Sequence, residues 1–102
     1  MQKWSREEIE EFINDKKTGL LYLYTPLCGT CQVAGKMLMI IKELISDLSI
    51  GKSDLNYISD IADQWEVESV PCLIIFKEGR LYEKLYAFHS VPNLLEKIKK
   101  TI

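Results

Sequence analysis

The residues of this 102-residue chain best suited to chemistry are two cysteines three positions apart, Cys28 and Cys31. Thiol–disulfide exchange needs one exposed thiolate that attacks and a second thiol that releases the mixed disulfide. If a helix begins near Cys28, Cys31 returns one turn later on the same side, within disulfide reach. The free backbone N–H groups at the helix start then stabilise negative sulfur on Cys28. We therefore expect Cys28 to be the nucleophile and Cys31 the resolving thiol.

The cysteines have three other interpretations: a zinc site, a metal carrier and an inert pair. A zinc site needs four ligands, and beyond the pair only Cys72 and His89 remain, so we expect no resident metal and no cofactor. A metal or iron–sulfur carrier built on all three cysteines would need a fourth ligand from a second chain or from glutathione. The pair could also be inert, but its place after an apolar strand and a turn favours a redox motif.

Composition and charge restrict the classes of partner. Thirteen basic and fifteen acidic residues are interspersed and leave a net charge of -2, so the concentrated basic surface that binds nucleic acid is missing. Residues 1–8 turn polar and acidic at once, unlike a secretory signal, and the most apolar stretch, Met37 to Ile41, is too short to span a bilayer. We expect a cytoplasmic protein with neither a nucleic-acid nor a membrane partner. In a reducing cytoplasm, a close cysteine pair indicates catalysis, redox sensing or metal binding.

Helices and strands alternate along the apolar pattern, and the length suits one domain over residues 1–102. This alternation predicts an α/β fold with a central mixed β-sheet flanked by helices on both faces. Helices are expected at 6–15, from about 28 to 48, briefly around 59–65, and after Ser90. Strands are expected at 20–24, weakly at 49–54, at 72–76 and at 81–87.

Local signals mark the ends of several elements. Ser5 and Glu8 fit a capping box at the start of the first helix, and Gly19 is expected near its C-cap. Ser59 or Asp60 is expected to cap the brief helix. Gly79 can take the positive φ of a hairpin turn.

Two segments together resemble the thioredoxin family, from about Trp4 to Lys100. They are Leu27-Cys28-Gly29-Thr30-Cys31 after a strand, and the run from Ser69 to Gly79 that contains Val70-Pro71-Cys72. The resemblance implies a thioredoxin fold and a cis Pro71 that faces the cysteines. It also implies that an extended substrate peptide pairs with the backbone at Val70 and Pro71. Disulfide-containing proteins are then the substrates, and an upstream thioredoxin reductase is the electron donor.

The resemblance also points to accessory residues beside the cysteines. Gly29 and Thr30 lie between them, and Lys52 matches a family lysine near the resolving cysteine, although a solvated strand lysine fits as well. Cys72 directly follows the proline, where threonine is usual. It could act as a third thiol near Cys28, or it could be a small apolar strand residue.

The chain departs from the thioredoxin pattern at five places. Leu27 replaces a tryptophan of the family, Thr30 a proline, Tyr22 a buried aspartate and Lys36 a kinking proline. The position of a family glycine on the docking surface falls near Tyr86. A tyrosine cannot assist proton transfer near neutral pH, and Thr30 offers donors that proline lacks. We therefore expect a less reducing protein than housekeeping thioredoxin. The alternative function is a non-catalytic thioredoxin-fold module that senses redox state or binds a partner.

Overall fold

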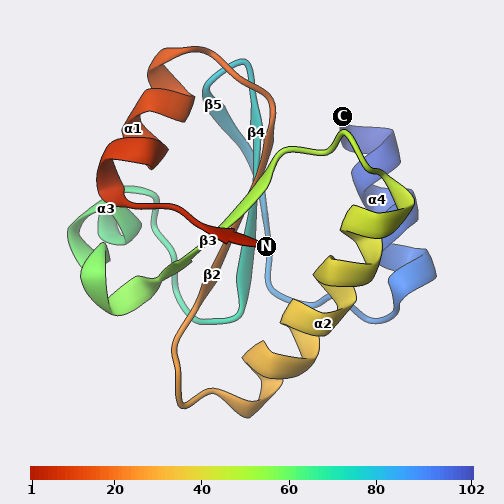
Figure 1. Ribbon diagram of the computed structural model, residues 1–102. Helices are drawn as coiled ribbons and strands as arrows, with labels where there is room; N and C mark the ends of the chain where they lie inside the picture. Colours follow the sequence, from red (N-terminus) through yellow and green to blue (C-terminus); the bar gives the residue numbers. More distant parts are fainter.

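The computed structural model describes all 102 residues and places a five-stranded sheet between two pairs of helices (Figure 1). The strands are β1 Gln2–Lys3, β2 Gly19–Tyr24, β3 Ile50–Asp54, β4 Cys72–Lys77 and β5 Arg80–Leu85. The helices are α1 Arg6–Asn14, α2 Gly29–Leu44, α3 Ser59–Gln64 and α4 Val91–Thr101, with a short 3-10 turn, η1, at Leu55–Tyr57. None of these helices is both long and apolar enough to cross a membrane.

The sheet is mixed, with the strand order β1-β3-β2-β4-β5. β3 runs parallel to β1 and β2, whereas β4 runs antiparallel to both β2 and β5. Helices α1 and α3 cover one face and α2 and α4 the other (Figure 1). The predicted α/β class and the mixed sheet with helices on both faces are therefore confirmed.

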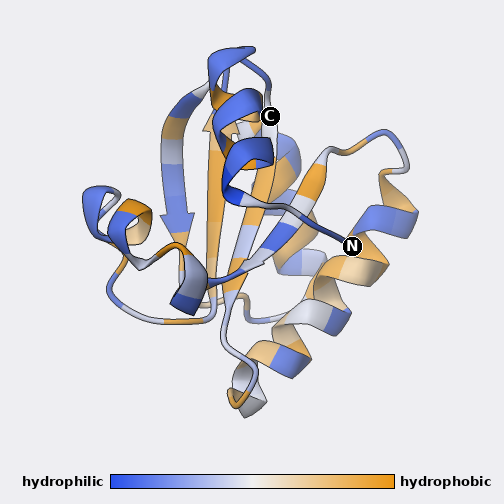
Figure 2. Ribbon diagram, turned by 60° about the vertical axis from the view of Figure 1, so that its left-hand side comes forward, coloured by the Kyte–Doolittle hydropathy of each residue, from blue (hydrophilic) through white to orange (hydrophobic).

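The side chains of the central strands alternate between two buried clusters. Leu20 and Tyr22 of β2 pack under α2 and α4, and Leu21 and Leu23 pack under α1 and α3. A strand buried on both faces needs side chains that can pack on both sides. β4 is hydrophobic along almost its whole length (Figure 2), and β2 combines leucines with two tyrosines. The edge strand β5 is only partly buried and carries three charged residues, Arg80, Glu83 and Lys84.

Several local predictions are confirmed. The Ser5 hydroxyl accepts the N–H of Glu8 and the Glu8 carboxylate accepts the N–H of Ser5, which closes the capping box of α1. Gly79 takes a φ of 80° in the turn between β4 and β5. Ser90 caps α4. These signals are local, so the sequence alone is enough to read them.

Other boundaries differ from the predictions. The helix expected to end near 48 ends at Leu44, because the Lys42 amine bonds to the carbonyls of Ser46 and Leu48 and holds the chain in a turn. Leu48 nevertheless packs in the α2–α4 cluster, which is why the apolar spacing continues past the helix. Gly19 is not a C-cap; it begins β2, where a Cβ atom would come 2.6 Å from the Ser49 carbonyl oxygen.

The predicted cap of the brief helix is wrong as well. Ile58 precedes α3 without any capping side chain, and Ser59 is already its first residue. The Asp60 carboxylate instead accepts two hydrogen bonds from the Arg6 guanidinium, at 2.7 and 3.0 Å. This tertiary ion pair between α1 and α3 cannot be read from the local sequence.

Candidate active site

Cys28 and Cys31 are joined by a disulfide at the start of α2, with their Cα atoms 5.1 Å apart. Cys28 is the N-cap residue and has an extended backbone; a short turn at Thr25–Leu27 connects it to the end of β2. Its Sγ accepts the backbone N–H of Cys31 at 3.1 Å. The sulfur thus occupies the position of a capping oxygen, where the unpaired N–H groups of the first turn favour negative charge.

The two sulfurs differ in their access to solvent. Cys28 is partly exposed, whereas Cys31 is 4% exposed and belongs to the cluster under α2. Gly29 and Thr30 between them are exposed, and the Thr30 hydroxyl lies 3.4 Å from Cys28 Sγ. An outer sulfur with hydrogen-bond donors beside a buried inner sulfur is the arrangement that an attacking and a resolving thiol require.

The loop before the disulfide is the most exposed apolar part of the site. Leu27, which stands directly before Cys28, is 99% exposed and packs on nothing. The preceding Pro26 is exposed as well. Leu27 is the most exposed of the protein's large exposed hydrophobic side chains.

The Val70–Pro71 peptide bond is cis and lies at the same end of the sheet as the disulfide. Cys72 pairs with Leu23 across β4 and β2, so Pro71 lies beside Tyr24, the residue that ends β2. Val70 and Pro71 are both partly exposed. The backbone before β4 is therefore available next to the loop that carries Cys28.

Two side chains, Lys84 in β5 and Tyr86 just after it, hold the segment that leads into Pro71. The Lys84 amine donates to the carbonyls of Trp65 at 2.8 Å and Glu66 at 2.9 Å. The Tyr86 hydroxyl accepts the backbone N–H of Glu68 at 3.2 Å. The sequence offered no signal for Lys84, because a lysine in an edge strand is indistinguishable from an ordinary solvated one.

Tyr22 lies directly behind the resolving cysteine. Its hydroxyl donates to the Cys31 carbonyl oxygen at 2.5 Å, and its side chain is 2% exposed. Burial, and to a smaller extent the neighbouring Tyr24, raise the pKa of Tyr22 to about 12. The phenol is therefore neutral near pH 7: it positions the Cys31 backbone but does not accept a proton from the Cys31 thiol.

Lys52 reaches the same region from β3, where it pairs in register with Tyr22. Its amine lies 5.6 Å from the centre of the Tyr24 ring, a cation–π contact. Lys52 lines the pocket that Tyr22 and Cys31 also line, so the structure brings it to the inner side of the disulfide.

The structure does not bring Cys72 together with the cysteine pair. Cys72 is fully buried and packs in the α1–α3 cluster, whereas Cys31 packs in the cluster on the opposite face of the sheet. Burial raises the pKa of the Cys72 thiol to about 11, which keeps it protonated. His89 is exposed, and no group of three or more His, Cys, Asp or Glu side chains comes together to hold a metal ion.

Comparison with known proteins agrees with this geometry. The sequence profile of the family described as Thioredoxin matches residues 1–100. Thioredoxin-like protein YusE of Bacillus subtilis is 44% identical over 100 residues, which make up 98% of this chain and 92% of YusE. The thioredoxin of Chlamydia caviae is 28% identical over 98 residues, 94% of this chain and 93% of its own length. Oxidised mitochondrial thioredoxin 3 of Saccharomyces cerevisiae has a TM-score of 0.84 at 25% identity, covering 100% of this chain and 95% of the other.

Proposed function

Because the chain belongs to the thioredoxin family, we propose that its thiol–disulfide exchange reduces disulfides in protein substrates of the cytoplasm. The general activity, that of a thiol–disulfide oxidoreductase, follows from the family and from the bonded pair of Cys28 and Cys31. The observation that carries the proposal is the place of Cys28, a partly exposed sulfur that caps α2 and accepts a backbone N–H.

In the proposed reaction the reduced protein begins with a Cys28 thiolate. This thiolate attacks one sulfur of the substrate disulfide, and the other substrate sulfur leaves as a thiolate that takes a proton from water. The Cys31 thiol then loses its proton and attacks Cys28 Sγ in the mixed disulfide. The second substrate thiolate leaves, the substrate has gained two electrons, and the Cys28–Cys31 disulfide seen in the structure is the product.

Substrate docking is assigned to the surface around Cys28. We place an extended substrate segment against the backbone of Val70 and Pro71, where it adds to the end of β4 in the manner of an extra strand. Exposed Gly29 and Thr30 line its path to the sulfur, and Leu27 supplies an apolar contact. Support for this placement comes from the exposure of these residues and from the hydrogen bonds of Lys84 and Tyr86, which hold the segment before Pro71.

Regeneration of the dithiol needs an electron donor. By family membership we assign this role to a thioredoxin reductase, which would return two electrons to the Cys28–Cys31 disulfide through the same exposed sulfur. Lys52 is assigned an accessory role, because its positive charge on the inner side of the disulfide favours loss of the Cys31 proton.

One observation favours a second candidate function, a redox sensor without turnover. Tyr22 stands behind Cys31 and cannot take a proton near neutral pH, so the resolving step lacks a built-in base. A slow resolving step suits a protein that holds a mixed disulfide or records oxidation rather than one that turns over.

Reduction of insulin disulfides with dithiothreitol as electron source separates the two functions. Wild type should accelerate precipitation of the insulin B chain well above the dithiothreitol background, and Cys28→Ser should return the rate to that background. Cys72→Ser serves as the matched control and should retain the wild-type rate, because Cys72 lies on the other face of the sheet. Equal rates for wild type and Cys28→Ser would overturn the reductase and favour the sensor.

A further inference from the structure

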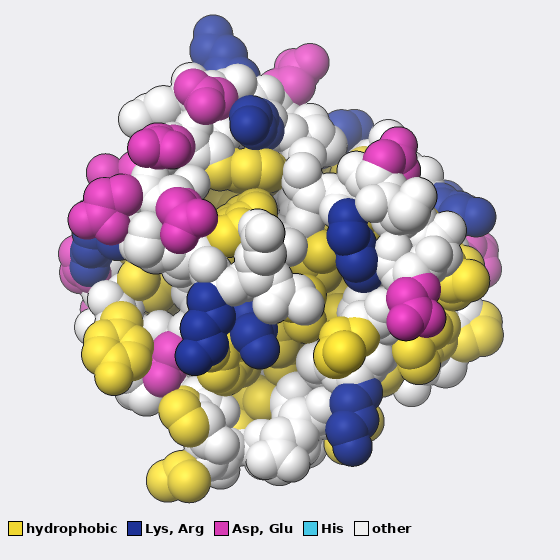
Figure 3. All heavy atoms as spheres, in the orientation of Figure 1, with side chains coloured by type: hydrophobic (Ala, Val, Ile, Leu, Met, Phe, Trp, Pro, Cys, Tyr) yellow, Lys and Arg dark blue, Asp and Glu magenta, His cyan; other side chains and the backbone are white.

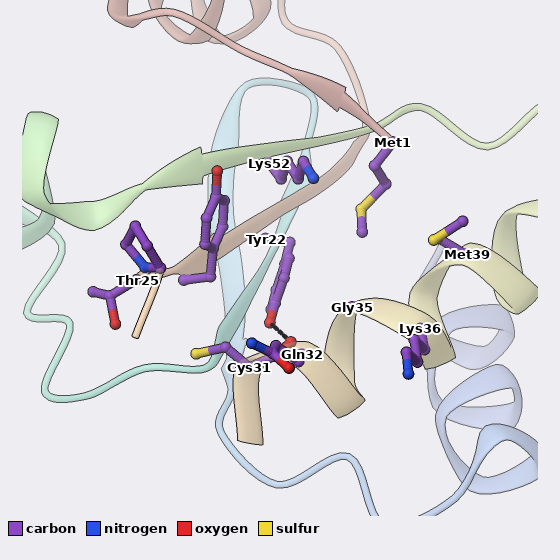
Figure 4. A pocket seen from close by; sticks show the side chains of 11 residues that line it. Met1, Tyr22, Thr25, Cys31, Gln32, Gly35, Lys36, Met39 and Lys52 are labelled. Atoms are coloured by element: carbon purple, nitrogen blue, oxygen red, sulfur yellow. Dashed lines mark hydrogen bonds between the residues drawn. The ribbon is translucent and has the colours of Figure 1, made fainter. Parts of the chain in front are cut away.

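A pocket of about 400 Å³ lies on the inner side of the disulfide, between α2 and the strands β2 and β3 (Figure 4). Its volume falls in the range of ~300–1,000 Å³ that ligand sites in proteins occupy. Tyr22 and Lys52 enter it from the sheet, and Gly35 and Met39 line it from α2. The proposed reductase chemistry uses Cys31 and Lys52 from the lining of this pocket but assigns no occupant to the space itself.

The pocket exists because of two small features of the sequence. Gly35 has no side chain, so α2 leaves a gap beside the sheet, and the nearest atom to an added Cβ would be Tyr22 Cε2 at 3.7 Å. Tyr22 directs its hydroxyl to the Cys31 carbonyl and so lies along one wall instead of filling the space. A single side chain at position 35 would therefore occupy the pocket without disturbing the backbone.

The charge of the lining is one-sided. Its eleven residues include Lys36 and Lys52 but no aspartate or glutamate. Neither lysine takes part in the three ion pairs of the protein. The nearest carboxylate along β3, that of Asp54, already accepts the N–H of Asn56. Most of the acidic side chains on the face that Figure 3 shows lie at the upper left, over α1, and others lie at the right of the view.

The walls of the pocket are mainly apolar and partly aromatic. The rings of Tyr22 and Tyr24 stack with their centres 5.8 Å apart; Tyr22 is buried behind the pocket, and Tyr24 is partly exposed. Met1 and Met39 add thioether side chains, which adapt to and favour aromatic ligands. In Figure 4 the Lys52 amine lies between the Tyr22 ring and the Met1 side chain, at the sheet side of the same space. The Tyr24 ring, beside a lysine amine that contacts this ring but has no carboxylate partner, favours a ligand that is flat and negatively charged.

We propose that this pocket binds a small aromatic monoanion of the carboxylate class, with its ring against the partly exposed Tyr24 and its carboxylate on the Lys52 amine. Lys36, at the exposed rim, adds to the positive potential. This ligand site is additional to the thiol chemistry and does not depend on it. Because the ligand would touch Tyr24, which stacks on the ring whose hydroxyl holds the Cys31 carbonyl, the site lies where binding can be sensed at the disulfide.

The test is a titration of the oxidised protein, labelled with ¹⁵N, using 2-naphthoate as the probe. Its neutral counterpart, 2-naphthamide, has the same ring and shape but no charge. We expect naphthoate to shift the backbone amides of Gly35, Lys52 and their neighbours. We also expect its Kd to be at least about fivefold lower than that of the amide, as a charge-assisted contact provides.

Three variants define the site. Lys52→Met keeps the aliphatic stem and removes the charge, so naphthoate should bind at least about fivefold more weakly while naphthamide is unaffected. Lys99→Met, on the far part of α4 and exposed, is the matched control and should bind as wild type does. Gly35→Leu should block binding of both probes. Gly35→Ala should fold as wild type does, which would show that the α2 backbone accepts a side chain at this position.

The outcomes are unambiguous for the oxidised protein. Equal affinity for naphthoate and naphthamide, or an unchanged naphthoate affinity in Lys52→Met, would overturn the proposal. Shifts confined to residues outside the pocket would overturn it too. The titration involves no thiol, so failure here leaves the insulin assay untouched, and failure of the insulin assay leaves this site untouched.

Discussion

Replacing Thr30 by valine should make the Cys28–Cys31 couple more reducing. The Thr30 hydroxyl lies 3.4 Å from Cys28 Sγ, and a disulfide sulfur has no hydrogen to give, so the hydroxyl is the donor. A hydroxyl stabilises a thiolate more than a neutral disulfide sulfur, so it favours the reduced state. Valine has nearly the same shape but no donor, and its presence should therefore disfavour the reduced state.

The size of the effect follows from the exposure of Thr30. A hydrogen bond to a charged group contributes about 1.5–3 kcal/mol. Thr30 is exposed, so water partly replaces the lost donor, and the lower end of that range applies. About 1.4 kcal/mol corresponds to about 30 mV for a two-electron couple. The reduction potential of Thr30→Val should thus lie about 30 mV below that of wild type.

Equilibration against glutathione redox buffers, with the two states resolved by thiol alkylation, measures both potentials. The wild-type value should lie above about -270 mV, the value of a reference thioredoxin. Thr30→Ser keeps the hydroxyl and should match wild type. A potential for Thr30→Val equal to or above that of wild type would refute the assigned role of the hydroxyl.

Three further predictions concern stability. Tyr22→Phe should lower the free energy of unfolding by about 1 kcal/mol, because it removes one neutral hydrogen bond to the Cys31 carbonyl; a denaturant titration showing no loss would contradict this. Ser5→Ala should lower it by about 1 kcal/mol through loss of the α1 cap, whereas Ser59→Ala, at a position that caps nothing, should change it little in the same titration. Because burial raises the pKa of the Cys72 thiol from 9.0 to about 11, the stability it contributes is complete below the unfolded value and declines as pH rises toward the folded one. Cys72→Ala should accordingly lose less stability than wild type between about pH 9 and pH 11, as followed by denaturant titrations across that range, and identical pH dependence would count against the assignment.

Much of the fold could be predicted from the sequence because its signals are local. The apolar run of β2, the capping box at Ser5 and the turn glycine at Gly79 each specify a conformation within a few residues. β1 could not be predicted, because Gln2–Lys3 is polar and short. It becomes a strand only because β3 offers it a parallel partner.

The candidate site divides in the same way. The spacing of Cys28 and Cys31 places both sulfurs at one helix turn, so their juxtaposition could be predicted from residue types. The side chosen by Cys72 could not, because it depends on the register between β4 and β2, which pairs Cys72 with Leu23. The contacts of Lys84 with the segment before Pro71 likewise arise from tertiary packing and leave no sequence signal.

Trapping of the mixed disulfide shows whether Cys28 is the attacking sulfur. With Cys31→Ser and insulin as the disulfide, we expect a stable adduct, mapped by mass spectrometry to Cys28 alone. Cys28→Ser should form no comparable adduct, because Cys31 is buried and Cys72 is buried on the α1–α3 face of the sheet. An adduct mapped to Cys72, or one formed equally well by Cys28→Ser, would rule out Cys28 as the attacking sulfur.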